Sequence, residues 1–235
     1  WAVQGLRLCD IKIECGYTAA GTLVVSDVID ADSWRLVDEQ GRGLDKQAYR
    51  DGADLRQVAD TYEEVSRRVA RFDELHKRPR IVLWNASLQD DPQPFVEELK
   101  RLGTPADLVM GVGSVHKGPE QSLELLRSLV AERPADTVVI VHVGRSNGAG
   151  PVFACDTHVP VITVSPTILK TPEDIWSSVN VPSDCPLLFQ KYPANAIQAA
   201  LSILAARNPH AYVARRMIIE NAHLSMENSI TFWWT

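Results

Sequence analysis

The feature that most constrains the fold is a regular alternation of short apolar runs with segments of helical pattern, beginning at Ile81. The apolar runs are RIVLW, ADLVMGV, TVVIVHV and VPVITVSP, and the first two helical segments are PFVEELKRLG and PEQSLELLRSLVAERP. Pro94 and Pro119 fall where the first turn of a helix accepts proline, and Gly103 closes the first helix. Such alternation predicts an α/β domain with a parallel sheet covered by helices on both faces. Ligands of such sheets bind beyond the carboxyl ends of the strands.

The first third of the chain has a different pattern. LRLCDIKIEC and GTLVVSDVI alternate as strands do, with YTAAG between them as a hairpin turn, and residues 55–75 keep helical spacing. The charged segment HKRPR contains Pro79 and separates the two patterns. We therefore predict one domain over residues 1–76 and another over residues 77–235. Because the chain starts at Trp1, we expect it to be a piece of a longer protein.

Composition narrows the class of partner. With 45% hydrophobic residues, 23% charged residues and a net charge of −6, the chain is typical of a soluble globular protein. The negative charge argues against a broad nucleic-acid or membrane surface, but a small phosphorylated ligand needs only a few local cations. No apolar run approaches the roughly 20 residues of a membrane span. Four cysteines without CxxC spacing favour reduced cytosolic thiols over disulfides or zinc.

Two loops that follow predicted strands contain the candidate catalytic and ligand-binding residues. In GSVHKGP, backbone N–H groups, the following helix dipole and Lys117 can converge on an anion, and His116 can move a proton near neutral pH. In GRSNGAGP, three glycines either serve tight turns or let the backbone approach a ligand closely. Each loop alone is also consistent with a simple connection between strand and helix.

Taken together, these motifs are specific. HKGP, GRSNGAGPV, PVITVSP and IWSSVNVP, in this order, resemble the aminoimidazole ribonucleotide carboxylase of purine biosynthesis, in the animal type that uses CO2 directly. The stretches DIKIECG, SDVIDADSWRL and LDKQAYRD are similar to the C-terminal part of phosphoribosylaminoimidazole-succinocarboxamide synthetase. That synthetase precedes the carboxylase in the animal bifunctional enzyme, so the resemblance covers nearly the whole chain.

The resemblance implies a flavodoxin-like three-layer parallel sheet, preceded by a fragment of an α+β synthetase domain. It implies a cytoplasmic homo-octamer that acts on a small-molecule ribotide and CO2, with neither nucleic acid nor membrane as partner. The carboxylase is an ATP-independent lyase that needs no cofactor, whereas the complete synthetase is a ligase that uses ATP and Mg. We expect the ligase activity to be incomplete in this chain.

The resemblance also assigns residues of the carboxylase. His116 is the catalytic residue that shuttles the proton at C4 of the imidazole. The substrate-binding residues are Ser87, Asp90, Ser114, Lys117, Gly144, Arg145, Ser146 and Asn147. The family's first loop reads glycine-serine-x-serine-aspartate, and in NASLQDD we place Asn85 at the glycine and Ala86 at the first serine, which predicts weak phosphate binding. The altered loop keeps open a catalytically impaired ribotide-binding or scaffold paralogue.

In the synthetase part, the resemblance assigns two sets of residues. Lys12, Glu14 and Asp27 lie at the Mg-nucleotide, with Glu14 and Asp27 as the metal ligands. Asp32, Arg35, Lys46 and Arg50 bind the carboxylated ribotide. Each residue alone is as well explained by a solvated surface charge.

The remaining candidates are expected to be structural. These are His76, His142, His158, His210, His223 and the interface tryptophans Trp233 and Trp234. A flavin or dinucleotide binder is a weaker alternative, since no strand is followed by GxGxxG.

Overall fold

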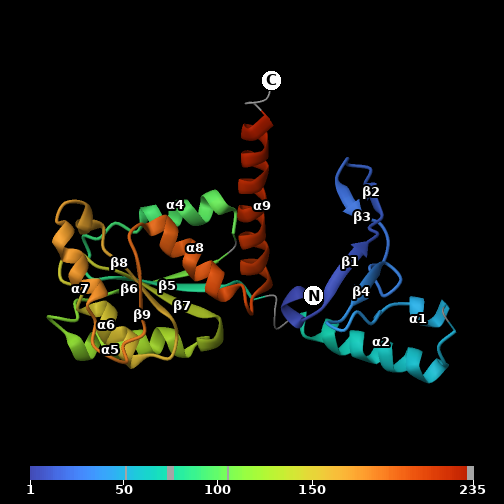
Figure 1. Cartoon of the computed structure of the whole chain (residues 1–235), viewed down its shortest axis with the longest axis horizontal. Coiled ribbons are helices and arrows are strands. Elements are labelled where there is room, and N and C mark those ends of the chain that lie inside the picture. Colours follow the sequence, from blue (N-terminus) through green and yellow to red (C-terminus); the bar gives the residue numbers. More distant parts are fainter. Residues whose placement is uncertain (51, 73–76, 105, 232–235) are drawn as a thin grey trace. The chain divides into compact units, whose positions relative to one another are not determined.

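A computed structural model describes residues 1–50, 52–72, 77–104 and 106–231 (Figure 1). The chain divides into two compact units, residues 1–76 and 77–235. His76, Trp233 and Trp234, for which structural roles are predicted, lie outside the described residues. None of the helices in the described part is long and apolar enough to cross a membrane.

Unit 1 contains two small antiparallel sheets. β1 (Arg7–Ile11) pairs with β4 (Trp34–Val37), and β2 (Cys15–Tyr17) pairs with β3 (Leu23–Val25). The predicted YTAAG hairpin turn is present between β2 and β3, with Gly21 at a φ of 78°, which favours glycine. The strand expected over LRLCDIKIEC is divided in two: the N–H of Lys12 still donates to Ser33 O at 2.7 Å beside β4, and β2 then pairs with β3 in a second sheet.

Among its described residues, unit 1 also has the α-helices α1 (Gln47–Arg50) and α2 (Leu55–Ala70). α2 begins where the carboxylate of Asp54 accepts hydrogen bonds from the backbone N–H groups of Arg56 and Gln57. Its buried residue Val65 joins a small core. The other buried members of this core are Leu6, Leu36 and Leu44.

Unit 2 is built on a five-stranded parallel sheet in the order β6-β5-β7-β8-β9. The strands are β5 (Arg80–Asn85), β6 (Asp107–Val112), β7 (Thr137–His142), β8 (Val161–Val164) and β9 (Leu187–Gln190). The helices are α4 (Gln93–Leu102), α5 (Pro119–Ala131), α6 (Ala149–Asp156), α7 (Trp176–Val179), α8 (Pro193–Leu204) and α9 (Pro209–Thr231).

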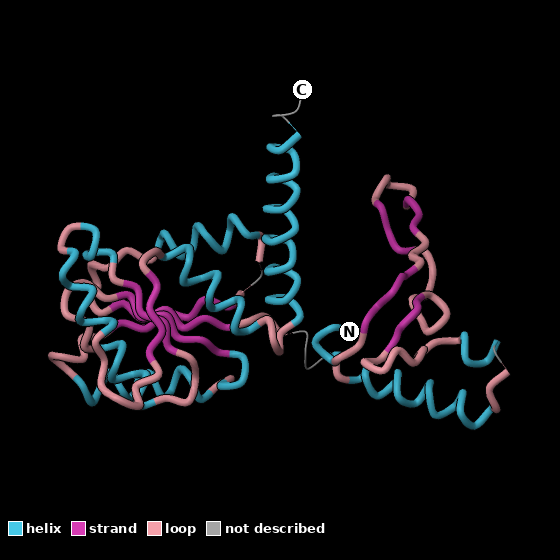
Figure 2. The backbone as a smooth tube through the Cα atoms, in the orientation of Figure 1, coloured by secondary structure: helices cyan, strands magenta, loops and turns pink. Residues whose placement is uncertain are grey.

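The sheet lies between two layers of helices (Figure 2). Successive side chains of a strand point to opposite faces, so Ile81 and Leu83 pack under α4 and α8 while Val82 and Trp84 pack against α5 and α6. Each face has its own apolar cluster, and the central strands β5 and β7 are fully buried. This three-layer arrangement confirms the predicted flavodoxin-like α/β fold.

Besides α6, two elements of unit 2 are not predicted by the sequence pattern. β9 is a four-residue strand at the edge of the sheet, and its apolar run LLF is too short to predict a strand, with side chains that are mostly half-buried. α9 packs on α8 through Ala211 and Ala214, but Met217 and Leu224 are exposed, so its apolar residues do not form one stripe. Both elements depend on tertiary contacts more than on local pattern.

Candidate active site

Three loops leave the same edge of the sheet in unit 2. They cover residues 86–92 after β5, 113–118 after β6 and 143–148 after β7. β5 lies between β6 and β7, so the first loop starts between the other two. This edge holds the carboxyl ends of the strands, where open α/β sheets bind ligands.

The predicted catalytic histidine is in contact with the glycine-rich loop. A Cβ atom built on Gly148 would lie 2.4 Å from Nε2 of His116, so only glycine leaves room for the imidazole. Ser114 O accepts hydrogen bonds from the N–H groups of Lys117 and Gly118 at 3.1 and 2.8 Å. This turn leaves the side chains of His116 and Lys117 exposed. The structure thus brings the HKGP and GRSNGAGP motifs together.

The loop that carries His116 rests on a buried tryptophan. Trp84 Nε1 donates to Gly113 O at 3.0 Å, and its ring packs edge-to-face on Phe153 with centroids 4.8 Å apart. A Cβ atom on Gly111 or Gly113 would lie 2.5 or 2.9 Å from the Trp84 ring. This support is not predicted from the sequence, although GVG after an apolar run is consistent with close packing.

The side chain of Asn147 stabilises the glycine-rich loop through buried hydrogen bonds. It is buried, and its Nδ2 donates to Thr163 Oγ1 and to Ser178 Oγ, both at 3.2 Å. Its Oδ1 accepts the N–H of Gly150 at 2.9 Å, which fixes the start of α6. Asn147 is predicted to bind substrate, but its amide is directed into the protein and holds the loop in place.

The rest of this loop is held by residues that sequence reasoning did not single out. The N–H of Ser146, which has a φ of 57°, donates to the carboxylate of Asp174 at 3.0 Å. Gly144 O accepts hydrogen bonds from the hydroxyls of Ser165 and Thr167 at 2.8 and 2.5 Å. The side chains of Arg145 and Ser146 are exposed.

The first loop begins one residue later than predicted. Asn85 is the last residue of β5, paired with Val112 and His142, so the loop starts at Ala86. If the five-residue pattern glycine-serine-x-serine-aspartate starts with the loop, it falls on residues 86–90. In that register Ser87 takes the position of the first serine and Asp90 that of the aspartate, whereas the register predicted from the sequence places Asn85 at the glycine and Ala86 at the first serine.

Ser87 and Asp90 close this loop on each other. The N–H of Ser87 donates to Asp90 Oδ2 at 2.8 Å, and the N–H of Asp90 donates to Ser87 O at 3.2 Å. Ser87 Oγ also accepts the N–H of Gln89 at 3.2 Å. The hydroxyl of Ser87 is exposed and lies where an anion can reach it.

A buried polar pair lies beneath this loop. His142 Nδ1 lies 3.3 Å from Asn85 Oδ1, and the ring of Phe95 packs edge-on against the imidazole. Burial lowers the pKa of His142, while the carboxylates of Asp90 and Asp91 act in the opposite direction. Burial is the larger of the two effects, so the pKa of His142 lies below its ordinary value.

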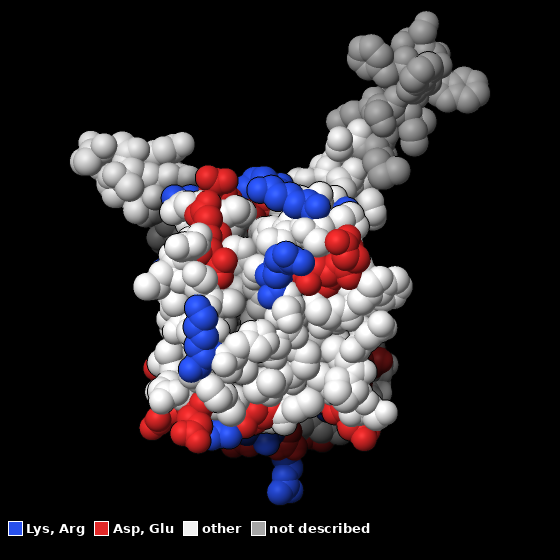
Figure 3. All heavy atoms as spheres, turned by 90° about the vertical axis from the view of Figure 1, so that its left-hand side faces the viewer, with Lys and Arg blue, Asp and Glu red and all other residues white. Residues whose placement is uncertain are grey.

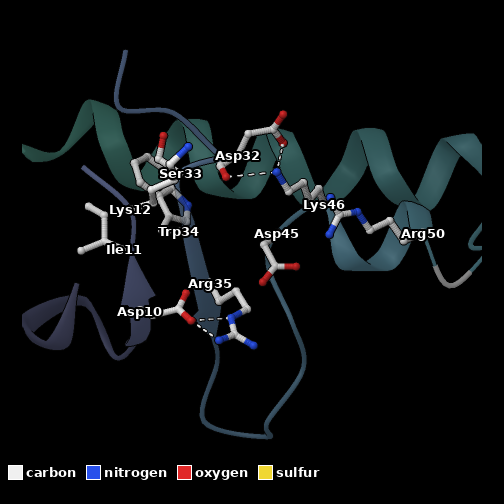
Figure 4. Close-up of a pocket in the computed structure, with 10 residues that line it drawn as sticks. All are labelled: Asp10, Ile11, Lys12, Asp32, Ser33, Trp34, Arg35, Asp45, Lys46 and Arg50. Atoms are coloured by element: carbon white, nitrogen blue, oxygen red, sulfur yellow. Dashed lines mark hydrogen bonds and ion pairs between the residues drawn. The ribbon is translucent and has the colours of Figure 1, made fainter. Parts of the chain in front are cut away.

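Unit 1 has a separate polar pocket of about 370 Å³ (Figure 4). Its charged lining residues are Asp10, Lys12, Asp32, Arg35, Asp45, Lys46 and Arg50. Four of the predicted ribotide-binding residues, Asp32, Arg35, Lys46 and Arg50, are therefore brought together. Lys46 Nζ lies 3.5 Å from Asp32 Oδ1, and Arg35 Nε donates to Asp10 Oδ2 at 2.7 Å.

Of the predicted nucleotide residues, Lys12 lines this pocket, while Glu14 and Asp27 lie at the open end of the β2–β3 hairpin. Glu14 precedes β2 and Asp27 follows β3, and the N–H of Ser26 donates to Glu14 O at 2.9 Å. Lys12 Nζ pairs with Glu14 Oε1 at 2.5 Å, and this contact raises the pKa of Lys12. Within the described ranges, no three His, Cys, Asp or Glu side chains form a group able to hold a metal ion.

Comparison with known proteins identifies relatives of both units. A family model for AIR carboxylase matches residues 86–224, and one for SAICAR synthetase matches residues 1–69. The probable multifunctional protein ADE2 of Caenorhabditis elegans is 35% identical over 217 residues, covering 88% of this chain and 51% of that protein.

A human relative and a bacterial structure agree with these matches. The human bifunctional phosphoribosylaminoimidazole carboxylase/phosphoribosylaminoimidazole succinocarboxamide synthetase is 33% identical over 248 residues, covering 97% of this chain and 56% of that protein. The chain thus spans about half the length of the curated relatives it matches. The crystal structure of Treponema denticola PurE has a TM-score of 0.58 at 24% identity, covers 66% of this chain and 98% of its own, and shares the fold.

Proposed function

Since the chain belongs to the AIR carboxylase family, we propose that unit 2 carboxylates aminoimidazole ribonucleotide with CO2, as a step of purine biosynthesis. The observation that carries this proposal is the contact between His116 and Gly148, because it joins a proton-transfer group to a glycine-rich loop at the ligand-binding edge of the sheet. The product is carboxyaminoimidazole ribonucleotide.

The reaction needs positioning and one proton transfer. The electron-rich ring attacks CO2 through C4, a carbon–carbon bond forms, and the C4 proton leaves to the imidazole of His116. The ring itself supplies the electron pair, so the reaction proceeds without ATP or another cofactor. A positioned general base contributes a factor of roughly 10² to 10⁴ in rate.

The exposed polar groups around His116 fit the other parts of the substrate. Lys117 and Ser114, with Ser87 and Asp90 from the first loop, hold the phosphate and ribose. Gly144, Arg145 and Ser146 form the side of the pocket that receives CO2 and the ring. Asn147 contributes indirectly, because its buried amide fixes the backbone of that loop.

We further propose that the protein is a cytoplasmic homo-octamer. Apolar side chains exposed on unit 2 provide surface for contacts between copies, namely Leu169, Trp176, Val179, Val213, Met217, Ile219 and Leu224. On the side that carries α7, charged side chains lie mainly near the margins and much of the centre is uncharged (Figure 3). Light scattering tests this assembly, and a mass of one chain at micromolar concentration contradicts it.

For unit 1 we propose a part of a SAICAR synthetase site. The pocket of Asp32, Arg35, Lys46 and Arg50 binds the carboxylated ribotide, since its cations suit a phosphate and a carboxylate. Glu14 and Asp27 fit Mg²⁺, which commonly takes one or two protein carboxylates together with phosphate oxygens of the nucleotide. When bound, the ion neutralises charge on the phosphates of ATP.

We expect these 235 residues, assayed alone, to make no succinocarboxamide. The reason is that the SAICAR synthetase match spans residues 1–69 and the relatives are about twice as long as the chain. Product formation that depends on ATP and aspartate would contradict this expectation.

The carboxylase is tested by following the loss of ribotide absorbance in bicarbonate buffer without ATP. His116→Asn is expected to lower turnover by at least about a hundredfold while ribotide binding changes little. His158→Asn is the matched control, since His158 is also exposed but lines a cavity with Pro134 and Pro160, away from the three loops. Tight ribotide binding without turnover in the unsubstituted chain would instead indicate a non-catalytic paralogue.

A further inference from the structure

Two cysteines of unit 2 that are far apart in the sequence lie side by side. Cys155 is exposed in the last turn of α6, and Cys185 is half-buried just before β9. The Cys185 thiol donates to Pro151 O at 3.7 Å, and Leu187 N donates to Cys185 O at 2.9 Å, which fixes the backbone there.

The hydrogen bond to Pro151 O places the Cys185 thiol beside the turn of α6 that carries Cys155. In an α-helix the carbonyl of one residue faces the N–H of the residue four positions later, so Pro151 O lies in the turn that carries Cys155. The neighbouring Cys155 thiol helps to raise the pKa of Cys185, and Cys185 also packs on the apolar cluster around Phe153. Contact between α6 and β9 elsewhere keeps the two segments together.

We propose that Cys155 and Cys185 form a reversible disulfide when the chain meets a low-molecular-weight disulfide such as oxidised glutathione. The thiolate of Cys155 attacks one glutathione sulfur, which forms a mixed disulfide and releases one glutathione. The Cys185 thiol then loses its proton and attacks the Cys155 sulfur, which releases the second glutathione. Two protein thiols are oxidised and one glutathione disulfide is reduced to two thiols, so atoms and electrons balance.

Exposure and burial give the two cysteines different parts in this exchange. Cys155 is accessible to the oxidant, so it forms the mixed disulfide first. Burial, followed by the contact with Cys155, raises the pKa of the Cys185 thiol, so a smaller fraction of it is thiolate at a given pH. Closure of the bond is consequently faster at higher pH.

The disulfide would link the two ends of the segment that forms hydrogen bonds to the glycine-rich loop. Between Cys155 and Cys185 lie the residues that hydrogen bond to that loop, namely Thr163, Ser165, Thr167, Asp174, Ser177 and Ser178. A crosslink across a long segment restricts the unfolded chain. Oxidation is therefore expected to raise the thermal unfolding midpoint of unit 2, and reduction to reverse the change.

The test treats the full chain with oxidised glutathione and maps its peptides by mass spectrometry without reductant. The expected product is a Cys155–Cys185 linked peptide, lighter by two hydrogen atoms than the two thiol peptides together, with a raised unfolding midpoint. Cys155→Ser is expected to abolish both changes. The double variant Cys9→Ser and Cys15→Ser is the matched control, since it removes two other exposed thiols and should keep both changes.

Two results would overturn the proposal. One is glutathione that remains on Cys155 in the unsubstituted chain while Cys185 stays a free thiol. The other is a crosslink that involves Cys9 or Cys15 in place of this pair. Because both readouts come from the unsubstituted protein, they hold even where a cysteine variant fails to fold.

Discussion

The imidazole of His116 occupies the space that a Cβ atom on residue 148 would need, and Gly148 is what leaves that space open. The two residues come from loops after β6 and β7, which lie on either side of β5. Their contact therefore bridges the end of β5, where the loop of Ser87 begins. The position of the proposed base depends on the absence of a side chain in the facing loop.

Gly148→Ala is expected to displace His116 and lower kcat by about a hundredfold, because a misplacement of about 1 Å can cost this much in rate. His116 is exposed, so its side chain can move aside and the fold should persist. Gly43→Ala is the control, since its new Cβ atom would lie 3.9 Å from the nearest other atom, Asp45 Oδ1. Steady-state kinetics and circular dichroism separate the two effects, and an unchanged kcat in Gly148→Ala would argue against His116 as the base.

Asn147→Ala is expected to lower the free energy of unfolding of unit 2 by about 1–3 kcal/mol, because it leaves buried hydrogen-bonding groups without their partner. Those groups are the hydroxyls of Thr163 and Ser178 and the N–H of Gly150. Asn195→Ala removes an exposed amide from α8 and should leave stability nearly unchanged. Hydrogen exchange at amides of β7 gives both values, and equal stability of the two variants would contradict a structural role for Asn147.

Ser87→Ala is expected to raise KM for the ribotide roughly ten- to a hundredfold with little change in kcat, because a hydrogen bond to a charged group contributes about 1.5–3 kcal/mol. Ala86→Ser, by contrast, should not lower KM if the family's glycine position is the first residue of the loop, which is Ala86. Ser128→Ala, an exposed serine in α5, is the control. If Ala86→Ser lowers KM and Ser87→Ala leaves KM unchanged, the register predicted from the sequence, with Ala86 at the first serine, is the correct one.

The sequence predicts the parallel sheet of unit 2 and the two loops that contain GSVHKGP and GRSNGAGP, because the signals for them are local. Apolar runs mark the buried strands, and proline and glycine mark the ends of helices. β9 and α9 escape this pattern, since β9 is a half-buried edge strand and α9 buries only part of its surface.

The directions of the polar side chains are the part that the sequence cannot predict. Asn147 stands among exposed residues of a glycine-rich loop, yet its amide is buried because Thr163 and Ser178 come from distant segments. The register of the first loop is likewise set by pairing of Asn85 with Val112 and His142 on two other strands. Such contacts are visible only once the strands are placed side by side.

The buried His142 makes the stability of unit 2 depend on pH. Burial lowers its pKa from the ordinary value of 6.5, so below that pH the unfolded chain binds more protons than the folded one. The free energy of unfolding is therefore expected to fall as the pH drops through about 6.5, until the lower pKa of the folded state is reached. Above about pH 7.5 this group contributes no pH dependence.

His142→Gln removes the titrating group and keeps an amide that can pair with Asn85, so the loss of stability between about pH 7 and pH 5 should become smaller. His158→Gln replaces an exposed histidine and should leave that loss unchanged. Urea unfolding at a series of pH values measures both, and NMR titration of the His142 ring gives its pKa directly. Asp90 and Asp91 oppose the effect of burial, so a ring pKa above 6.5 would show that the carboxylates prevail and that His142 is charged when the chain is folded.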